Sequence, residues 1–243
     1  MDANQLRTYE DNPAVAKAFA EEMVQQIEEL TKIQDRISIA VSGGSTPKLL
    51  FELLGKEYRE RIDWGKLHFF WVDDRCVPAD SPESNYGQTK SLLFDHVDLP
   101  EKNIFWVQGE KDPAQESQRY ESLIREWFQI AETELPEFDL LFLGMGTDGH
   151  TASIFPHEME LLNSNRLCEV ATHPETGQKR ITLTGPVINA AAKVYFLITG
   201  SSKKEILDQI LNQKDGFLSY PAAHIHPSLP AKIYTDKAAV GVS

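Results

Sequence analysis

The sequence predicts an α/β protein built on an open, mostly parallel sheet with helices on both faces, a modified Rossmann-like arrangement. Short apolar runs that are typical of buried strands alternate along the chain with longer stretches of helical periodicity. Three glycine-rich or acidic turns follow directly on such apolar runs. No internal repeat or low-complexity linker breaks the alternation, so we expect a single domain over residues 1–243.

Each expected element rests on a local signal. Asn12 is a good helix N-cap and Pro13 suits the first turn of a helix, whose apolar periodicity continues to about residue 32. The region 76–111 is the least regular, and we expect a cap or an insertion there. The expected elements are, in chain order, helix 12–32, strand 36–41, a helix through 49–54, strand 67–72, helix 86–96, helix 113–132, strands 138–143, 179–184 and 193–198, helix 203–212 and strand 231–235.

The composition limits the partners of the chain. Its 243 residues carry a formal charge of −13, which argues against nucleic acid or an anionic membrane as the main partner, because both need a positive field. No apolar run approaches the ~20 residues that span a bilayer, and no signal-peptide pattern is present. Cys76 and Cys168 lack the spacing of metal ligands. We therefore expect a cytoplasmic monomer or small homo-oligomer with reduced thiols, acting on a small molecule.

The first turn is Ser42-Gly43-Gly44-Ser45-Thr46, between a strand and a helix. Adjacent glycines allow close approach of an anion, and the free N–H groups of the helix start and the hydroxyls are donors. The sequence therefore predicts a phosphate site. The alternative is a plain tight turn in which Ser45 or Thr46 caps the helix.

The second turn is Asp73-Asp74-Arg75, which follows the strand 67–72. Two adjacent acids need a partner when buried, and Arg75 can supply one. A structural ion pair at the strand end is one interpretation. In the functional interpretation, Asp73 orients a water, a sugar hydroxyl or a histidine, and Arg75 holds a phosphate or a developing negative charge.

The third turn runs from Gly144 to Pro156 and contains Asp148-Gly149-His150. A histidine at the end of a buried strand can transfer protons near neutral pH. The segment also matches G-x-G-x-x-G, but it comes late in the chain and Pro156 limits any helix after it, which argues against a dinucleotide site. Small residues flank His150, so we expect an accessible imidazole.

Two later cations could complete an anion site. Lys203 opens a helix after Gly200-Ser201-Ser202, and Arg180 stands at the start of a strand. The alternative for each is a solvated surface charge. His224 and His226 receive no role from the sequence.

Four motifs carry a family resemblance over residues 37 to about 235. They are Ser42-Gly43-Gly44-Ser45-Thr46-Pro47, Asp73-Asp74-Arg75 with Val77-Pro78, the run from Gly144 to Pro156, and Gly200-x-x-Lys203. Together they resemble those of the 6-phosphogluconolactonases, whose relatives are the glucosamine-6-phosphate isomerases. The resemblance implies hydrolysis of 6-phospho-D-glucono-1,5-lactone to 6-phospho-D-gluconate, a step of the pentose phosphate pathway.

The resemblance also implies roles for residues. His150 would be the general base that activates water, and Asp73 or Asp148 would orient its imidazole, with Asp73 the better match to the family's functional acid. The sugar phosphate would bind the segment 42–46, with Arg75, Arg180 and Lys203 as its cationic contacts. A lactone is an activated ester, so neither a metal nor a cofactor is expected. The oxyanion donor stays open between a backbone N–H group and a cationic side chain.

Two departures from the family pattern bear on the alternatives. The isomerases follow Asp-Gly-His with an Asn-Glu-Pro segment, whereas this chain has Ser153-Ile154-Phe155-Pro156 and no acid. The lactonases usually have Asp-Glu-Arg where this chain has Asp73-Asp74-Arg75. The alternative functions are a phosphosugar isomerase or deaminase and a non-catalytic phosphosugar-sensing domain. The absence of a helix-turn-helix before residue 36 and the acidic charge disfavour the sensing domain.

Overall fold

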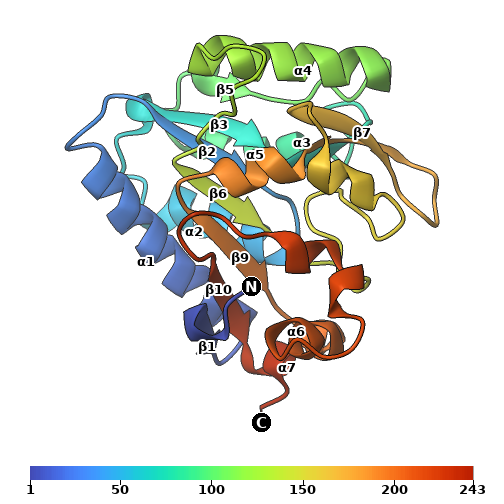
Figure 1. Ribbon diagram of the computed structural model, residues 1–243. Helices are drawn as coiled ribbons and strands as arrows, with labels where there is room; N and C mark the ends of the chain where they lie inside the picture. The colour runs from blue at the N-terminus through green and yellow to red at the C-terminus, as the bar shows by residue number, and fades with distance from the viewer. Residues whose placement is uncertain (243) are drawn as a thin grey trace.

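The computed structural model describes residues 1–242, in which seven strands form one parallel sheet (Figure 1). All six strand pairs of this sheet are parallel, so the predicted sheet is confirmed. The strands, in spatial order, are β1 (Leu6–Tyr9), β10 (Lys232–Asp236), β9 (Val194–Ile198), β6 (Leu140–Leu143), β2 (Ile37–Val41), β3 (Leu67–Trp71) and β5 (Ile104–Phe105).

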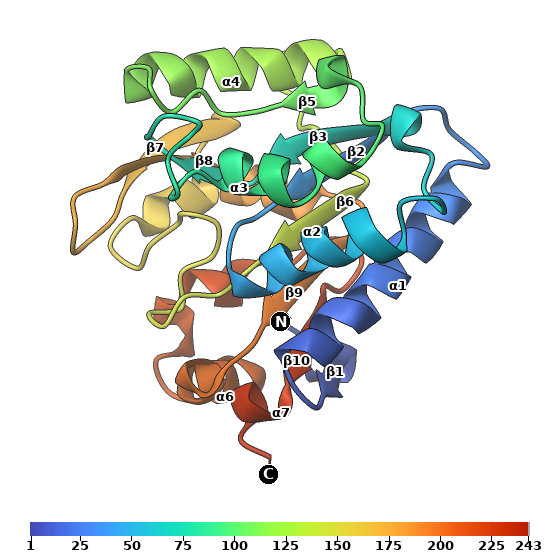
Figure 2. The ribbon, with the colours of Figure 1, turned by 180° about the vertical axis from the view of Figure 1, so that it is seen from behind.

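Helices cover both faces of the sheet because its strands alternate their side chains between two apolar clusters. Along β2, Ile37, Ile39 and Val41 join the cluster under α1 and α2, whereas Ala40 joins the cluster on the opposite face. Figure 2 shows α2 and α3 in front of the sheet, and α5 lies in front in Figure 1. The helices are α1 (Asn12–Leu30), α2 (Ser45–Glu57), α3 (Asn85–Leu92), α4 (Pro113–Phe128), α5 (Gly185–Ala190), α6 (Lys204–Leu211) and α7 (Lys237–Val240).

A second, antiparallel sheet packs beside the first. Its strands are β4 (Asp73–Arg75), β8 (Lys179–Leu183) and β7 (Cys168–Thr172), in the order β4-β8-β7. The prediction of a turn at Asp73-Asp74-Arg75 is therefore wrong, because these residues form a strand that pairs with β8. Such a long-range pairing leaves no signal in a three-residue segment.

Several element ends also differ from the expectations. The side chain of Asp11, not Asn12, caps α1 by accepting the Ala14 N–H at 2.9 Å. Helix α4 ends at Phe128 because Gln129 takes a left-handed conformation (φ 56°). Region 76–111 is part of the main layers, since it supplies α3 and the edge strand β5. None of the helices within residues 1–242 combines the length and apolarity needed to span a membrane.

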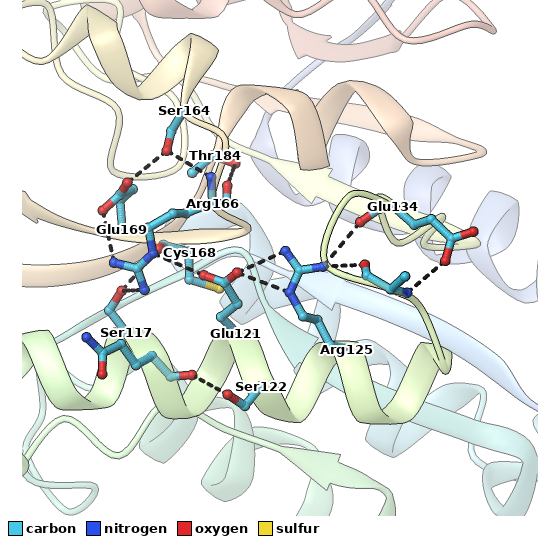
Figure 3. A network of polar contacts seen from close by, with 12 residues as sticks. Ser117, Glu121, Ser122, Arg125, Glu134, Ser164, Arg166, Cys168, Glu169 and Thr184 are labelled. Carbon is cyan, nitrogen blue, oxygen red and sulfur yellow. Dashed lines mark hydrogen bonds and ion pairs between the residues drawn. The ribbon is translucent and has the colours of Figure 1, made fainter.

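A network of charged and hydroxyl side chains fastens α4 to the small sheet (Figure 3). Glu121 of α4 accepts hydrogen bonds from Arg125 at 2.9 Å and from Arg166 at 3.2 Å. Arg166 also donates to Ser117 Oγ at 3.3 Å, and Ser117 donates to the carbonyl of Cys168 in β7 at 3.0 Å. The network links α4 to β7 at the edge of the small sheet.

Candidate active site

The site lies where the order of the parallel strands reverses. Strand β3, which follows β2 in the main sheet, lies on one side of β2. The later strands β6 and β9 lie on the other side of β2, in that order. Ligands of open α/β sheets bind at such a switch point, beyond the carboxyl ends of the strands. A cavity of about 360 Å³ opens there. The predicted site residues that line it are Ser42, Gly43, Gly44, Ser45, Thr46, Asp73, Arg75, His150, Arg180 and Lys203.

His150 carries a fixed tautomer because Asp148 lies against its ring. His150 Nδ1 is 2.6 Å from Asp148 Oδ1, and the backbone N–H of His150 donates to the same oxygen at 3.1 Å. An ionised carboxylate can only accept, so Nδ1 carries the proton and Nε2 is left as an acceptor. Of the two acids that the sequence left open, Asp148 therefore contacts the imidazole, although Asp73 had been the better match to the family pattern.

Electrostatics keep Asp148 ionised. Its partial burial raises the pKa of the carboxyl, but the hydrogen bonds and electrostatic attraction between Asp148 and His150 outweigh this, and the pKa falls to about 2. Asp148 is thus a permanent negative partner for the imidazole at neutral pH.

Glycines shape the turn that carries this pair. A Cβ on Gly146 would lie 2.1 Å from His150 Nδ1, so a side chain there would displace the ring. Gly149 has φ +78° and packs against Tyr220, where a Cβ would lie 2.5 Å from the aromatic ring. The turn therefore depends on both glycines to bring the imidazole to the cavity.

Asp73 lies in the cavity wall and makes no hydrogen bond with His150 among the described residues. Its Oδ2 accepts the hydroxyl of buried Ser153 at 2.6 Å, and no other side chain or N–H group within residues 1–242 donates to this carboxylate. Asn85 Nδ2 donates to the backbone carbonyl of Asp73 at 2.9 Å. The carboxylate thus keeps free acceptor capacity toward a ligand.

Asp74, whose role the sequence left open, is not among the residues that line the cavity and is 1% exposed. It accepts the backbone N–H groups of Arg75, Asn85 and Tyr86 at 2.8, 2.7 and 2.9 Å. Burial raises its pKa to about 6 despite these bonds. Asp74 therefore anchors the start of α3 to β4.

In the turn after β2, two of the three hydroxyls are already bonded within the protein, so most of the donors left for a ligand are backbone N–H groups. Ser42 Oγ donates to the Phe142 carbonyl at 2.7 Å, and Thr46 Oγ1 contacts Asn12 Oδ1 at 2.6 Å, so these two hydroxyls serve the fold. Gly44, with φ +123°, is the N-cap residue of α2 and has no side chain to bond the helix start, so neither Ser45 nor Thr46 is the N-cap. The start of α2 and the Ser45 hydroxyl, which has no hydrogen-bond partner within residues 1–242, face the cavity that a phosphate would fill.

Three cations line the cavity. Arg75 and Arg180 stand directly opposite each other in β4 and β8, an unfavourable arrangement for like charges. The Nε atoms of both are buried and find no acceptor among the described residues. Burial lowers the pKa of Arg180, as does the Arg75 charge, while Asp73 opposes the shift. Burial also lowers the pKa of Lys203, against the raising effect of Asp148. An anion bound in the cavity would offset both the repulsion between the two arginines and the cost of burying these positive charges.

The sequence analysis missed several residues of the site, among them Asn85, Ser153 and Thr199. Asn85 lines the cavity and fills the space beside Gly43, where a Cβ would lie 2.0 Å from its Oδ1. Ser153 lies behind Asp73 and Arg180. Asn85 follows Ser84, the N-cap of α3, and only that capping position could have drawn attention to it. His224 is not in the cavity wall and contacts the Leu218 carbonyl instead.

The fold and the cavity define an α/β protein with a ligand site at the strand switch point, built around a histidine–aspartate pair and three cations. The chain belongs to the family described as glucosamine-6-phosphate isomerases/6-phosphogluconolactonase, whose profile matches residues 10–234. The 6-phosphogluconolactonase of Haemophilus influenzae is 42% identical over 229 residues, covering 93% of this chain and 95% of that protein. That of Treponema pallidum is 39% identical over 226 residues, covering 90% and 86%.

Solved structures agree with these relatives. The crystal structure of 6-phosphogluconolactonase from Thermotoga maritima superposes with a TM-score of 0.83 at 29% identity, covering 96% of this chain and 99% of that one. The prediction of an enzyme of the 6-phosphogluconolactonase class is thereby confirmed.

Proposed function

We propose that this chain hydrolyses 6-phospho-D-glucono-1,5-lactone to 6-phospho-D-gluconate, with His150 as the general base and without a metal ion. The observation that carries the proposal is the His150–Asp148 pair, whose imidazole lines a cavity that three cations share. The names of the relatives supply the substrate.

The proposed reaction needs one proton acceptor that later acts as a donor. A water molecule attacks C1 of the lactone while His150 Nε2 takes its proton, and Asp148 stabilises the resulting imidazolium. The tetrahedral oxyanion collapses, the bond between C1 and the ring oxygen breaks, and the imidazolium returns the proton to that oxygen. The products are the open-chain hydroxyl and a carboxylic acid that ionises.

Positioning of the substrate comes from its phosphate. The start of α2 offers the Ser45 hydroxyl and N–H groups that have no acceptor among the described residues, and Lys203 approaches from the turn after β9. Binding the phosphate here would hold C1 of the lactone near the imidazole. The binding energy of the phosphate would thus orient the lactone for attack by water. Arg75 and Arg180 are the further cationic contacts of the proposal.

The environment of the imidazole favours hydrolysis over isomerisation. Asp148 is the only carboxylate within residues 1–242 that pairs with the ring. The fully buried ring of Phe155, which belongs to the segment where the isomerases have an acid, packs against it with centroids 4.7 Å apart. A single acid beside the histidine is what a water-activating base requires.

A pH-stat experiment tests the proposed function. Purified protein is mixed with fresh 6-phospho-D-glucono-1,5-lactone, and acid release is compared with spontaneous hydrolysis. We expect strong acceleration that persists after treatment with a chelator. Acid release at the spontaneous rate would overturn the proposal. Ammonia release from glucosamine 6-phosphate would instead indicate a deaminase, and ligand binding without turnover a sensing domain.

A further inference from the structure

Ser153 connects the catalytic turn to two charged groups of the cavity wall. It lies three residues after His150 and is fully buried. Its hydroxyl donates to Asp73 Oδ2 at 2.6 Å and accepts from Arg180 Nη1 at 3.4 Å. One oxygen atom thus joins the turn after β6, strand β4 and strand β8.

The turn holds Ser153 itself in place. The backbone N–H of Ser153 donates to Thr182 Oγ1 of β8 at 3.1 Å, and Thr151 Oγ1 donates to the Gly144 carbonyl at 2.9 Å. Between them, Ala152 takes a left-handed conformation with φ 50°, which costs energy for a residue with a side chain. The surrounding hydrogen bonds therefore enforce the position of the Ser153 hydroxyl.

We infer that Ser153 is a positioning residue, which orients Asp73 and Arg180 toward the bound substrate. The inference rests on the proposed function and adds to it a residue that does not itself line the cavity. The hydroxyl occupies one oxygen of Asp73 and so turns the remaining acceptor capacity of the carboxylate toward sugar hydroxyls. It also gives Arg180, whose Nε has no acceptor among the described residues, a partner that leaves its positive charge available for an anion.

The fold contains a matched control. Ser117 is also fully buried, donates to an oxygen (the Cys168 carbonyl) and accepts from an arginine (Arg166), but it lies on α4, away from the cavity. Ser153→Ala and Ser117→Ala each remove one buried hydroxyl and one arginine contact. If the Ser153 hydroxyl only stabilised the fold, both substitutions would lower Tm and neither would change kcat/KM per folded molecule.

The experiment compares kcat, KM and Tm of wild type, S153A and S117A with the phosphorylated lactone. A hydrogen bond to a charged group contributes enough that its loss lowers kcat/KM about tenfold or more. We expect that loss in S153A, mainly through KM, and wild-type kcat/KM in S117A. Wild-type kcat and KM in S153A would overturn the inference while leaving lactonase activity established.

A double-mutant cycle tests whether Ser153 acts through Asp73. We expect S153A to have less than about a third of its single-mutant effect in an Asp73→Asn background, since the oriented carboxylate is already lost. Where D73N leaves too little turnover, the same cycle is measured on the Kd for 6-phospho-D-gluconate. Full additivity of the two substitutions would overturn the role of Ser153 in positioning Asp73.

Discussion

The contact between His150 Nδ1 and Asp148 Oδ1 determines which imidazole nitrogen is free to accept a proton. Asp148→Asn keeps the size of the side chain but presents an amide that can stabilise the other tautomer and carries no charge. We expect kcat for the lactone to fall by about a hundredfold with a small change in KM. Steady-state kinetics with fresh lactone check this, and an unchanged kcat would exclude an orienting role for Asp148.

The pH dependence of stability tests the burial of Asp74. Its pKa is raised from 3.8 to about 6, so the folded state binds a proton that the unfolded state has released between these values. Asp74 therefore contributes fully to the free energy of unfolding below about pH 4, and this contribution is lost as the pH rises through about 6. The free energy of unfolding falls by about 3 kcal/mol over this range because of Asp74. Urea unfolding of wild type and Asp74→Asn from pH 4 to pH 7 measures it. We expect the wild type to lose stability relative to D74N over this range, and the opposite trend would contradict the burial argument.

At the scale of the element, the glycine turn after β6 sets the place of the base. Gly146→Ala puts a Cβ where His150 Nδ1 lies, so the ring must shift. We expect kcat/KM to fall about a hundredfold while the far-ultraviolet circular dichroism spectrum stays that of the wild type. Gly65→Ala is the control, because its Cβ meets only the end of the Asp63 side chain at 3.3 Å, away from the cavity. Equal activity of the two variants would show that the turn tolerates a side chain.

Sequence reasoning succeeded where the signal was local. The turns at 42–46 and 144–150 follow short, mostly apolar strands, so their glycines and His150 could be assigned to one edge of a parallel sheet. It failed where partners come from far along the chain. Nothing local shows that Asp73-Asp74-Arg75 pairs with β8, that Asp74 accepts the first N–H groups of α3, or that Ser153 reaches Asp73, which is 80 positions away.

At the scale of the whole molecule, an acidic protein concentrates positive charge in one cavity. The formal charge is −13, yet Arg75, Arg180 and Lys203 converge from β4, β8 and the turn before α6. The apolar clusters on the two faces share the central sheet, and we propose that the chain forms one domain. We also propose that this gathering of cations selects an anionic substrate.

Removing the phosphate tests that selection. We expect unphosphorylated glucono-1,5-lactone to have a kcat/KM at least about a hundredfold below that of the phosphorylated lactone. Lys203→Ala should raise KM for the phosphorylated lactone about tenfold and change little for the unphosphorylated one, because only the phosphate contact is lost. Equal effects of K203A on both substrates would exclude Lys203 as a phosphate contact.

The central claim is that His150 activates the attacking water in this cavity, and the kcat of His150→Gln measures it most directly. Calorimetric binding of 6-phospho-D-gluconate to the same variant shows whether the cavity is intact. We predict that kcat falls by at least about a hundredfold while the Kd for the product stays within about threefold of the wild type. A variant that binds the product and still turns over the lactone at the wild-type rate would contradict the account.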